Sequence, residues 1–140
     1  MAARKGLGDK FNLATSATTA AVRVNMKNAS GITIVLIGTT SAQMTLQEAN
    51  AASGGTIQSV QTGFTEYFTQ NNGVWTRVPQ GAAATATAVA GGLLAVYFAA
   101  VNLSAGFQYI AATVSAGSFV YILHELQLRR FPENMAAVTA

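Results

Sequence analysis

A single histidine and a single aspartate limit the catalytic chemistry open to this chain. A Ser-His-Asp arrangement would need Asp9 to orient His124, since each is the only residue of its type. Asp9 lies in an N-terminal stretch that we expect to be flexible, whereas His124 ends an apolar strand pattern. A triad requires a fixed contact between these two groups. We therefore interpret His124 as a core-edge or interface histidine with a hydrogen-bonded ring.

The sequence also gives no support for a metal site, a pair of catalytic carboxylates or a dinucleotide-binding motif. The chain has no cysteine, and His124 with Glu125 cannot supply the three or four ligands of a zinc site. No two of the four glutamates are spaced to form a glycosidase-type pair; they are Glu48, Glu66, Glu125 and Glu133. Residues 6–8 (GLG) lack the third glycine and the preceding strand of a dinucleotide fingerprint. The sequence predicts a protein that is not an enzyme and uses no cofactor.

Aromatic side chains could instead form a stacking surface for bases or sugars. They recur within strand patterns, at Tyr67, Phe68, Trp75, Tyr97, Phe98, Phe107, Tyr109, Phe119 and Tyr121. Their alternation favours core packing. Lysine and arginine are not interleaved with them, which argues against direct nucleic-acid binding. A glycan-binding module stays open because of Trp75 and the tyrosines.

The composition points to a protein that is covered by partners. The 140 residues fit one domain, with 51% hydrophobic and only 9% charged residues, against about 25% charged in typical soluble domains. Large exposed apolar patches usually mark interaction sites. The alternative is a monomer coated in threonine, serine, asparagine and glutamine. We favour assembly with copies of itself and with a larger structure.

Positive charge is concentrated near the N-terminus. Residues 1–27 hold five lysines and arginines against Asp9, whereas residues 28–128 hold Arg77 against three glutamates. The first residues lack the apolar core of a secretory signal. We expect residues 1–12 to form a flexible basic arm whose Arg4, Lys5 and Lys10 are candidate contacts to an acidic partner surface or to nucleic acid, although an N-terminus without a role is equally compatible with the sequence.

Hydrophobic alternation predicts strands rather than helices. Residues 20–26 alternate with period two, and the β-branched run 32–37 is typical of a strand covered on both faces. The turn residues between them suggest that the two form a hairpin. Residues 49–56 are expected to form a loop. Further strands are expected at 44–48, 65–69, 74–78, 93–100, 107–114 and 119–124.

Two turn signals refine this picture. Asn72-Gly73 between aromatic strands is a strong hairpin signal. Pro79 is expected to end the second strand of that hairpin because it cannot donate to a ladder. About eight short antiparallel strands predict an all-β fold, a single β-sandwich or jelly-roll-like barrel, over residues 13–131. Residues 132–140 form a C-terminal tail.

The uncharged segment 82–101 has the length of a transmembrane helix. Gly91-Gly92 in its middle, alternating threonines and the lack of flanking basic anchors other than Arg77 argue against a span. Two short strands separated by a Gly-Gly bend explain the segment better. We expect no membrane contact, and a membrane-active small protein is ranked below the other hypotheses.

Four segments of the sequence carry a resemblance to a known group of proteins: MTLQEANAASGG (44–55), GVWTRV (73–78), LSAGFQYI (103–110) and VYILHELQLRR (120–130) with Pro132. They resemble small virion structural proteins of tailed bacteriophages, similar in layout to head decoration (cement) proteins. The resemblance covers roughly residues 20–135 and is one of pattern rather than of a diagnostic motif.

This resemblance implies a function in the virion. Such proteins are β-sandwich or jelly-roll-like domains, commonly homotrimers, that sit on the outer capsid surface and stabilise it by binding between subunits of the major capsid protein. The expected partners are therefore the major capsid protein and copies of the chain itself. A head–tail connector or tail component of the virion is the alternative that the sequence leaves open.

Overall fold

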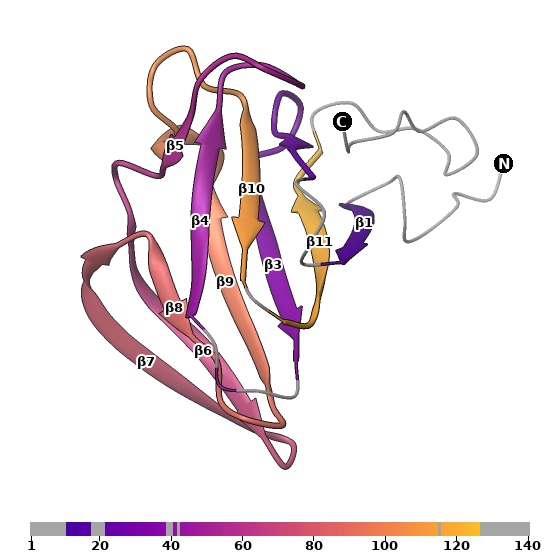
Figure 1. Ribbon diagram of the computed structural model, residues 1–140, viewed down its shortest axis with the longest axis vertical. Helices are drawn as coiled ribbons and strands as arrows, with labels where there is room; N and C mark the ends of the chain where they lie inside the picture. Colours follow the sequence, from indigo (N-terminus) through magenta and orange to yellow (C-terminus); the bar gives the residue numbers. More distant parts are fainter. Residues whose placement is uncertain (1–10, 18–21, 39–40, 42, 115, 127–140) are drawn as a thin grey trace, which may run out of the picture.

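The protein is a β-sandwich of two antiparallel sheets (Figure 1). The computed structural model describes residues 11–17, 22–38, 41, 43–114 and 116–126. The prediction of an all-β fold is confirmed, since these residues form eleven strands, one 3₁₀ turn at Ala100–Asn102 and no α-helix. The sequence predicted about eight strands; β1 and β5 were not expected, and the short β8 is the strand before the Gly-Gly bend expected within 82–101.

The larger sheet has six strands in the order β1-β11-β3-β9-β6-β7. Their bounds are β1 Phe11–Ala17, β3 Gly31–Ile37, β6 Phe64–Asn71, β7 Val74–Ala83, β9 Leu93–Ala99 and β11 Ser118–His124. The smaller sheet has the order β2-β10-β4-β5, with β8 pairing with the same strand, β4. Its strands are β2 Val24–Asn25, β4 Gln43–Ala49, β5 Ile57–Ser59, β8 Thr85–Thr87 and β10 Tyr109–Thr113.

The core lies between the two sheets and follows the period-two pattern of the sequence. Along β3, the inward residues Ile32, Ile34 and Leu36 are buried, and they alternate with less buried residues. The same alternation continues in both sheets. The inward side chains include Met44, Leu46, Leu94, Val96, Phe98, Ile110, Ala112, Phe119, Tyr121 and Leu123.

The hairpin predicted from Asn72-Gly73 is confirmed as β6–β7. Asn71 pairs with Val74 across the turn, and both Asn72 and Gly73 have positive φ, 49° and 78°. This left-handed backbone at both central residues matches the right-handed twist of the flanking strands. In Figure 1 the hairpin forms one end of the molecule.

The expected end of that second strand at Pro79 was wrong. β7 continues through Pro79 to Ala83. Because β7 is the outermost strand of its sheet, one of its sides has no ladder partner within the described chain, and a residue without an N–H is tolerated at such an edge. The register between the two strands shifts next to the proline, because residues 80–82 of β7 lie opposite the single residue Thr65 of β6.

The hairpin predicted over residues 20–37 was also wrong. β2 pairs with β10 in the smaller sheet, whereas β3 pairs with β11 and β9 in the larger one. The turn between them, closed by a hydrogen bond from the Ala29 N–H to the Met26 carbonyl, therefore passes from one sheet to the other. Alternation indicates which side chains are buried, but both sheets bury residues in the same core, so it does not select the neighbouring strand.

The segment 82–101 contains the end of β7, β8, a turn and β9, as predicted for strands separated by a Gly-Gly bend. Gly91 has a φ of 72° in that turn. Gly92 lies so close to the Gln70 carbonyl oxygen that a Cβ there would collide with it. No helix in the described ranges has the length and hydrophobicity of a membrane span.

The N-terminal boundary differs slightly from expectation. β1 begins at Phe11, within the segment 1–12 that the charge pattern assigns to the arm, and pairs with β11 along its whole length. The arm residues 1–10, including Arg4, Lys5 and Lys10, and the tail 132–140 lie outside the described residues.

Candidate functional site

The most deeply buried polar group of the described chain is the carboxylate of Glu48. This residue lies on the inner side of β4, is fully buried, and receives three hydrogen bonds. Its Oε2 accepts from the Ser104 backbone N–H at 2.9 Å, and its Oε1 accepts from the Ser104 hydroxyl at 2.5 Å and from the Gln58 amide at 2.8 Å. The carboxylate thus ties the β9–β10 connection and β5 to β4.

These donors determine the charge state of Glu48. Burial raises the pKa of its carboxyl, but the hydrogen bonds from Ser104 and Gln58 favour the ionised form more strongly and hold the pKa below its ordinary value of 4.5. Glu48 is therefore a carboxylate at neutral pH. All of its partners are neutral donors, so this arrangement fixes a loop and offers no proton at neutral pH.

The burial of Glu48 was not predicted, although the alternation of its strand indicates it. Met44, Leu46 and Glu48 share one face of a period-two strand, and that face is the apolar one. The donors, however, come from residues 10 and 56 positions away along the chain. The spacing of residues along the sequence does not predict hydrogen bonds between such distant positions.

His124 lies where the sequence placed it, at the end of β11. Its Nε2 is 2.6 Å from the Thr33 hydroxyl, and its ring centroid is 6.0 Å from that of Tyr97. The predicted hydrogen bond of the ring is confirmed, but the side chain lies on the outer side of the six-stranded sheet, together with Val120 and Ile122, and not at the edge of the core. Asp9 lies outside the described residues.

Catalytic constellations are not evident in the part of the chain that the structure describes. No three histidine, aspartate or glutamate side chains there gather closely enough to hold a metal ion. Glu66, on β6, forms an exposed ion pair with Arg77 of β7. Glu48 and Glu66 belong to different sheets, one buried and one exposed.

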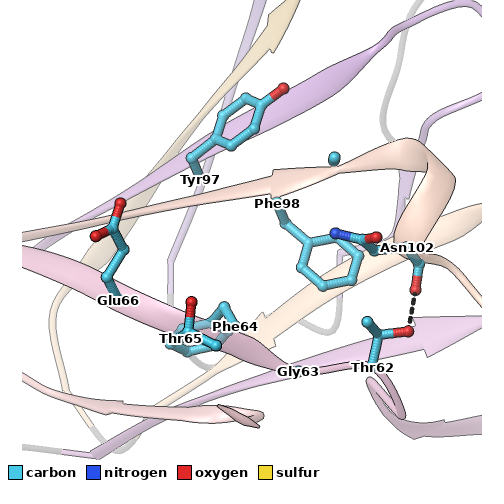
Figure 2. Close-up of a pocket in the computed structure, with 9 residues that line it drawn as sticks. Thr62, Gly63, Phe64, Thr65, Glu66, Tyr97, Phe98 and Asn102 are labelled. Carbon is cyan, nitrogen blue, oxygen red and sulfur yellow. Dashed lines mark hydrogen bonds between the residues drawn. The ribbon is translucent and has the colours of Figure 1, made fainter. Parts of the chain in front are cut away.

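An open pocket of about 270 Å³ lies where β6 diverges from β9 (Figure 2). The pairing of these strands covers only Phe68–Gln70 against Leu93–Ala95, so the residues beyond it border an opening. In Figure 2 the Thr62 hydroxyl donates to the Asn102 carbonyl, while Tyr97 and Glu66 rise beside the opening. The lining residues are Thr62, Gly63, Phe64, Thr65, Glu66, Tyr97, Phe98, Ala99 and Asn102.

This pocket offers limited chemistry. Its one carboxylate is already paired with Arg77, and the lining includes no histidine or second carboxylate that could act as a partner acid or base. Its hydroxyls and the Asn102 amide could bind polar groups weakly. The pocket fits a surface depression better than an active site.

The outer side of the six-stranded sheet holds five of the eight large hydrophobic side chains that are exposed in the described chain, namely Leu13, Ile37, Phe68, Trp75 and Tyr97. Polar residues such as Thr33, Gln70 and His124 lie among them on this side. At its centre, Val35 of β3 lies between Val120 of β11 and Ala95 of β9 in register. Ile37 and Trp75 are each 49% exposed on this side. We call this surface the apolar face; its hydrophobic residues are Leu13, Val35, Ile37, Phe68, Trp75, Leu93, Ala95, Tyr97, Val120 and Ile122.

The outer side of the five-stranded sheet is polar. Thr45, in the middle of β4, has Thr85 of β8 and Thr113 of β10 as its register partners. Other outward polar residues of this sheet are Asn25, Gln43, Gln47, Ser59 and Thr87, whereas Ile57 and Tyr109 add apolar surface at one end. In a β-sandwich the outer sides of both sheets are normally polar. Here the five-stranded sheet follows this rule, whereas the six-stranded sheet has a largely hydrophobic outer side.

Two expectations about hydrophobic residues are corrected by this asymmetry. The run 32–37 was expected to be covered on both faces, but within the described chain only its inner face is covered. The aromatic residues were expected in the core. Phe98, Phe119 and Tyr121 are there, whereas a second group projects from the apolar face: Phe68, Trp75 and Tyr97.

Comparisons of the chain with family models, with curated proteins and with solved structures gave no match.

Proposed function

We propose that this chain is a non-enzymatic structural protein that works by burying the apolar face against other subunits of a large assembly. The observation that carries the proposal is the contrast between the two outer sheet faces, one hydrophobic and one rich in threonine and glutamine. Large contiguous apolar patches on the surface of a folded domain usually mark protein–protein contacts. The low charge of the whole chain is consistent with this function.

The assembly that we propose is a bacteriophage capsid, on the strength of the sequence resemblance to head decoration proteins. In this function the protein attaches to the outer surface of the shell, between subunits of the major capsid protein, and stabilises it. Each contact contributes about 25 cal/mol per Å² of buried apolar area before association costs are subtracted. Many such contacts on a closed lattice would resist internal pressure without any catalytic step.

The test is a saturation titration of the purified full chain onto phage heads that lack it, with copies per particle counted after sedimentation. We expect saturation at a number matching the capsid lattice, together with heads that withstand higher temperature before releasing DNA. Saturation at the number of one ring would instead indicate a head–tail connector or tail component. An absence of binding to heads would contradict a function in the virion.

The basic arm provides a separate prediction. Replacing Arg4, Lys5 and Lys10 by alanine is expected to weaken attachment to heads at low ionic strength, since charge attraction between exposed groups is screened over about 10 Å at 0.1 M salt. The measurement is the same titration at 20 mM and 300 mM salt. Unchanged attachment of the variant at both salt concentrations would remove the arm from the contact surface.

A glycan-binding module is the second candidate, favoured by the three aromatic side chains that project from the apolar face. Phe68 is 37% exposed and Tyr97 53% exposed, and such rings could stack on sugar faces. Aliphatic residues nevertheless make up most of this face, and sugars do not match aliphatic surface. Binding on a glycan array that is lost in Trp75→Ala would favour this candidate over the structural one.

A further inference from the structure

We infer that the apolar face binds the same face of a second copy of this chain, so that the protein is a two-fold symmetric dimer in solution. The inference deepens the proposed function, on which it rests, by naming the partner that covers this face. Three properties of the described residues support it: the area of the face, its lack of net charge, and the absence of a second apolar face on the same molecule.

The area of the face suits a stable dimer. Six strands about 4.8 Å apart, each about seven residues long at about 3.4 Å per residue, span about 700 Å² before side-chain relief is counted. Stable protein–protein interfaces bury about 800 Å² on each partner. The outer side of this sheet as a whole, of which the apolar face is a part, therefore approaches the size of a complete interface.

The charge on the face permits contact between identical copies. Its hydrophobic centre, around Val35, Ala95 and Val120, has no charged residue. The charged residues toward one edge, Glu66 and Arg77, are paired with each other. Two copies thus meet without a like charge at the centre, which would otherwise oppose association of identical surfaces.

The polar outer side of the five-stranded sheet favours a two-fold dimer over a ring of three subunits in which the apolar face contacts a different surface of the neighbouring subunit. In a head-to-tail ring each subunit contacts its neighbour with two different surfaces, whereas a two-fold dimer uses one surface twice. The other large sheet face is polar, with Thr45 at its centre. A head-to-tail contact with that face would bury threonine and glutamine against valine and isoleucine. Only pairing of the apolar face with itself matches apolar to apolar.

The shapes of the side chains suggest the direction of the two-fold axis. Bulky Trp75, Phe68 and Tyr97 stand on β7, β6 and β9, whereas the central row has the smaller Val120 and Val35 on β11 and β3. An axis parallel to the strands, between β3 and β9, would place Phe68 of one copy over Val120 of the other. This arrangement keeps the facing strands nearly aligned, as in sandwiches.

The first test is sedimentation velocity and light scattering of the full chain over a range of concentrations. We expect a particle of twice the 14.5 kDa chain mass. Val35→Glu and, independently, Phe68→Glu should raise the dimer Kd by about a hundredfold or more, because each buries two like charges in an apolar contact. Thr45→Glu, the matched change on the polar face, should leave the dimer intact. Circular dichroism and thermal unfolding of each variant verify folding.

Thiol protection locates the interface independently of destabilising changes. The chain has no cysteine, so Val35→Cys and Thr45→Cys each introduce a single reactive group. Maleimide should modify the cysteine of Val35→Cys more slowly as protein concentration rises, whereas the rate for Thr45→Cys should not depend on concentration. Equal, concentration-independent rates would overturn the inference.

The outcomes separate this inference from the proposed function. A dimer that fails to bind heads supports the inference and contradicts the function. A monomer, or a trimer unaffected by Val35→Glu, overturns the inference. If such a monomer binds heads and Val35→Glu abolishes that binding, the face is covered by the shell protein instead, and the proposed function stands.

Discussion

Glu48→Ala is expected to lower the free energy of unfolding by about 3 kcal/mol or more, because hydrogen bonds to a buried charge contribute about 1.5–3 kcal/mol each and the donors left behind lose their partner. The Ser104 N–H and the Gln58 amide would remain without the acceptor that now satisfies them. Urea unfolding at pH 7, followed by circular dichroism, measures the difference. Glu66→Ala is the matched control, since its exposed ion pair is expected to contribute less than about 1 kcal/mol.

The same residue predicts a dependence on pH. The pKa of Glu48 is lower in the folded protein than its ordinary value of 4.5. The contribution of the ionised Glu48 to the free energy of unfolding is therefore complete above about pH 4.5 and is lost as the pH falls through the folded-state pKa. The stability difference between the wild type and Glu48→Gln should be largest near pH 7 and should shrink at lower pH. A difference that stays constant between pH 7 and pH 3 would contradict an ionised Glu48.

Ile34→Ala is expected to lower the free energy of unfolding by about 2–5 kcal/mol. Ile34 is fully buried at the centre of β3, where no solvent can fill the space left by the shortened side chain. Thermal and urea unfolding at low protein concentration, where self-association does not contribute, measure this loss. A loss below 1 kcal/mol would contradict the central position of Ile34 in the core.

Val35→Ala provides the matched comparison, because Val35 is the next residue of the same strand and points to the opposite side. We expect it to change the stability of the monomer by no more than about 1 kcal/mol, the range of strand preferences at partly exposed positions. Its main effect should instead be weaker self-association. The pair of variants thus separates folding from assembly within two adjacent residues. A Val35→Ala change that destabilises the monomer as much as Ile34→Ala would show that both sides of β3 are internal.

Local patterns in the sequence were sufficient to predict much of the fold. The Asn72-Gly73 turn requires positive φ at two positions, which few other residue pairs tolerate, so its hairpin could be predicted with confidence from two residues. Burial of Val24 and Met26 in the alternating run 20–26 follows from strand geometry in the same way. Pairing across the layers could not be predicted, as the failed hairpin over 20–37 shows, because it depends on contacts between residues such as Tyr109 and Asn25.

The candidate site was predicted only in part. The density of β-branched residues at 32–37 predicted a strand covered on both faces, whereas within the described chain only the inner side is covered, because alternation and residue type do not show which side packs on the second sheet. The buried Glu48 was missed because its donors lie far away along the chain. His124 was placed correctly, since its position at a strand end depends on local alternation alone.

Pro79 has a consequence for behaviour at high concentration. β7 is an outer strand of the sheet, and free strand edges can recruit further strands and grow into fibrils. The proline withholds an N–H within this edge, the extra residues of β7 between Pro79 and Ala83 interrupt its ladder with β6, and Arg77 adds a charge nearby. Uncontrolled polymerisation through this edge is thereby disfavoured, even when a chain this poor in charge accumulates during synthesis.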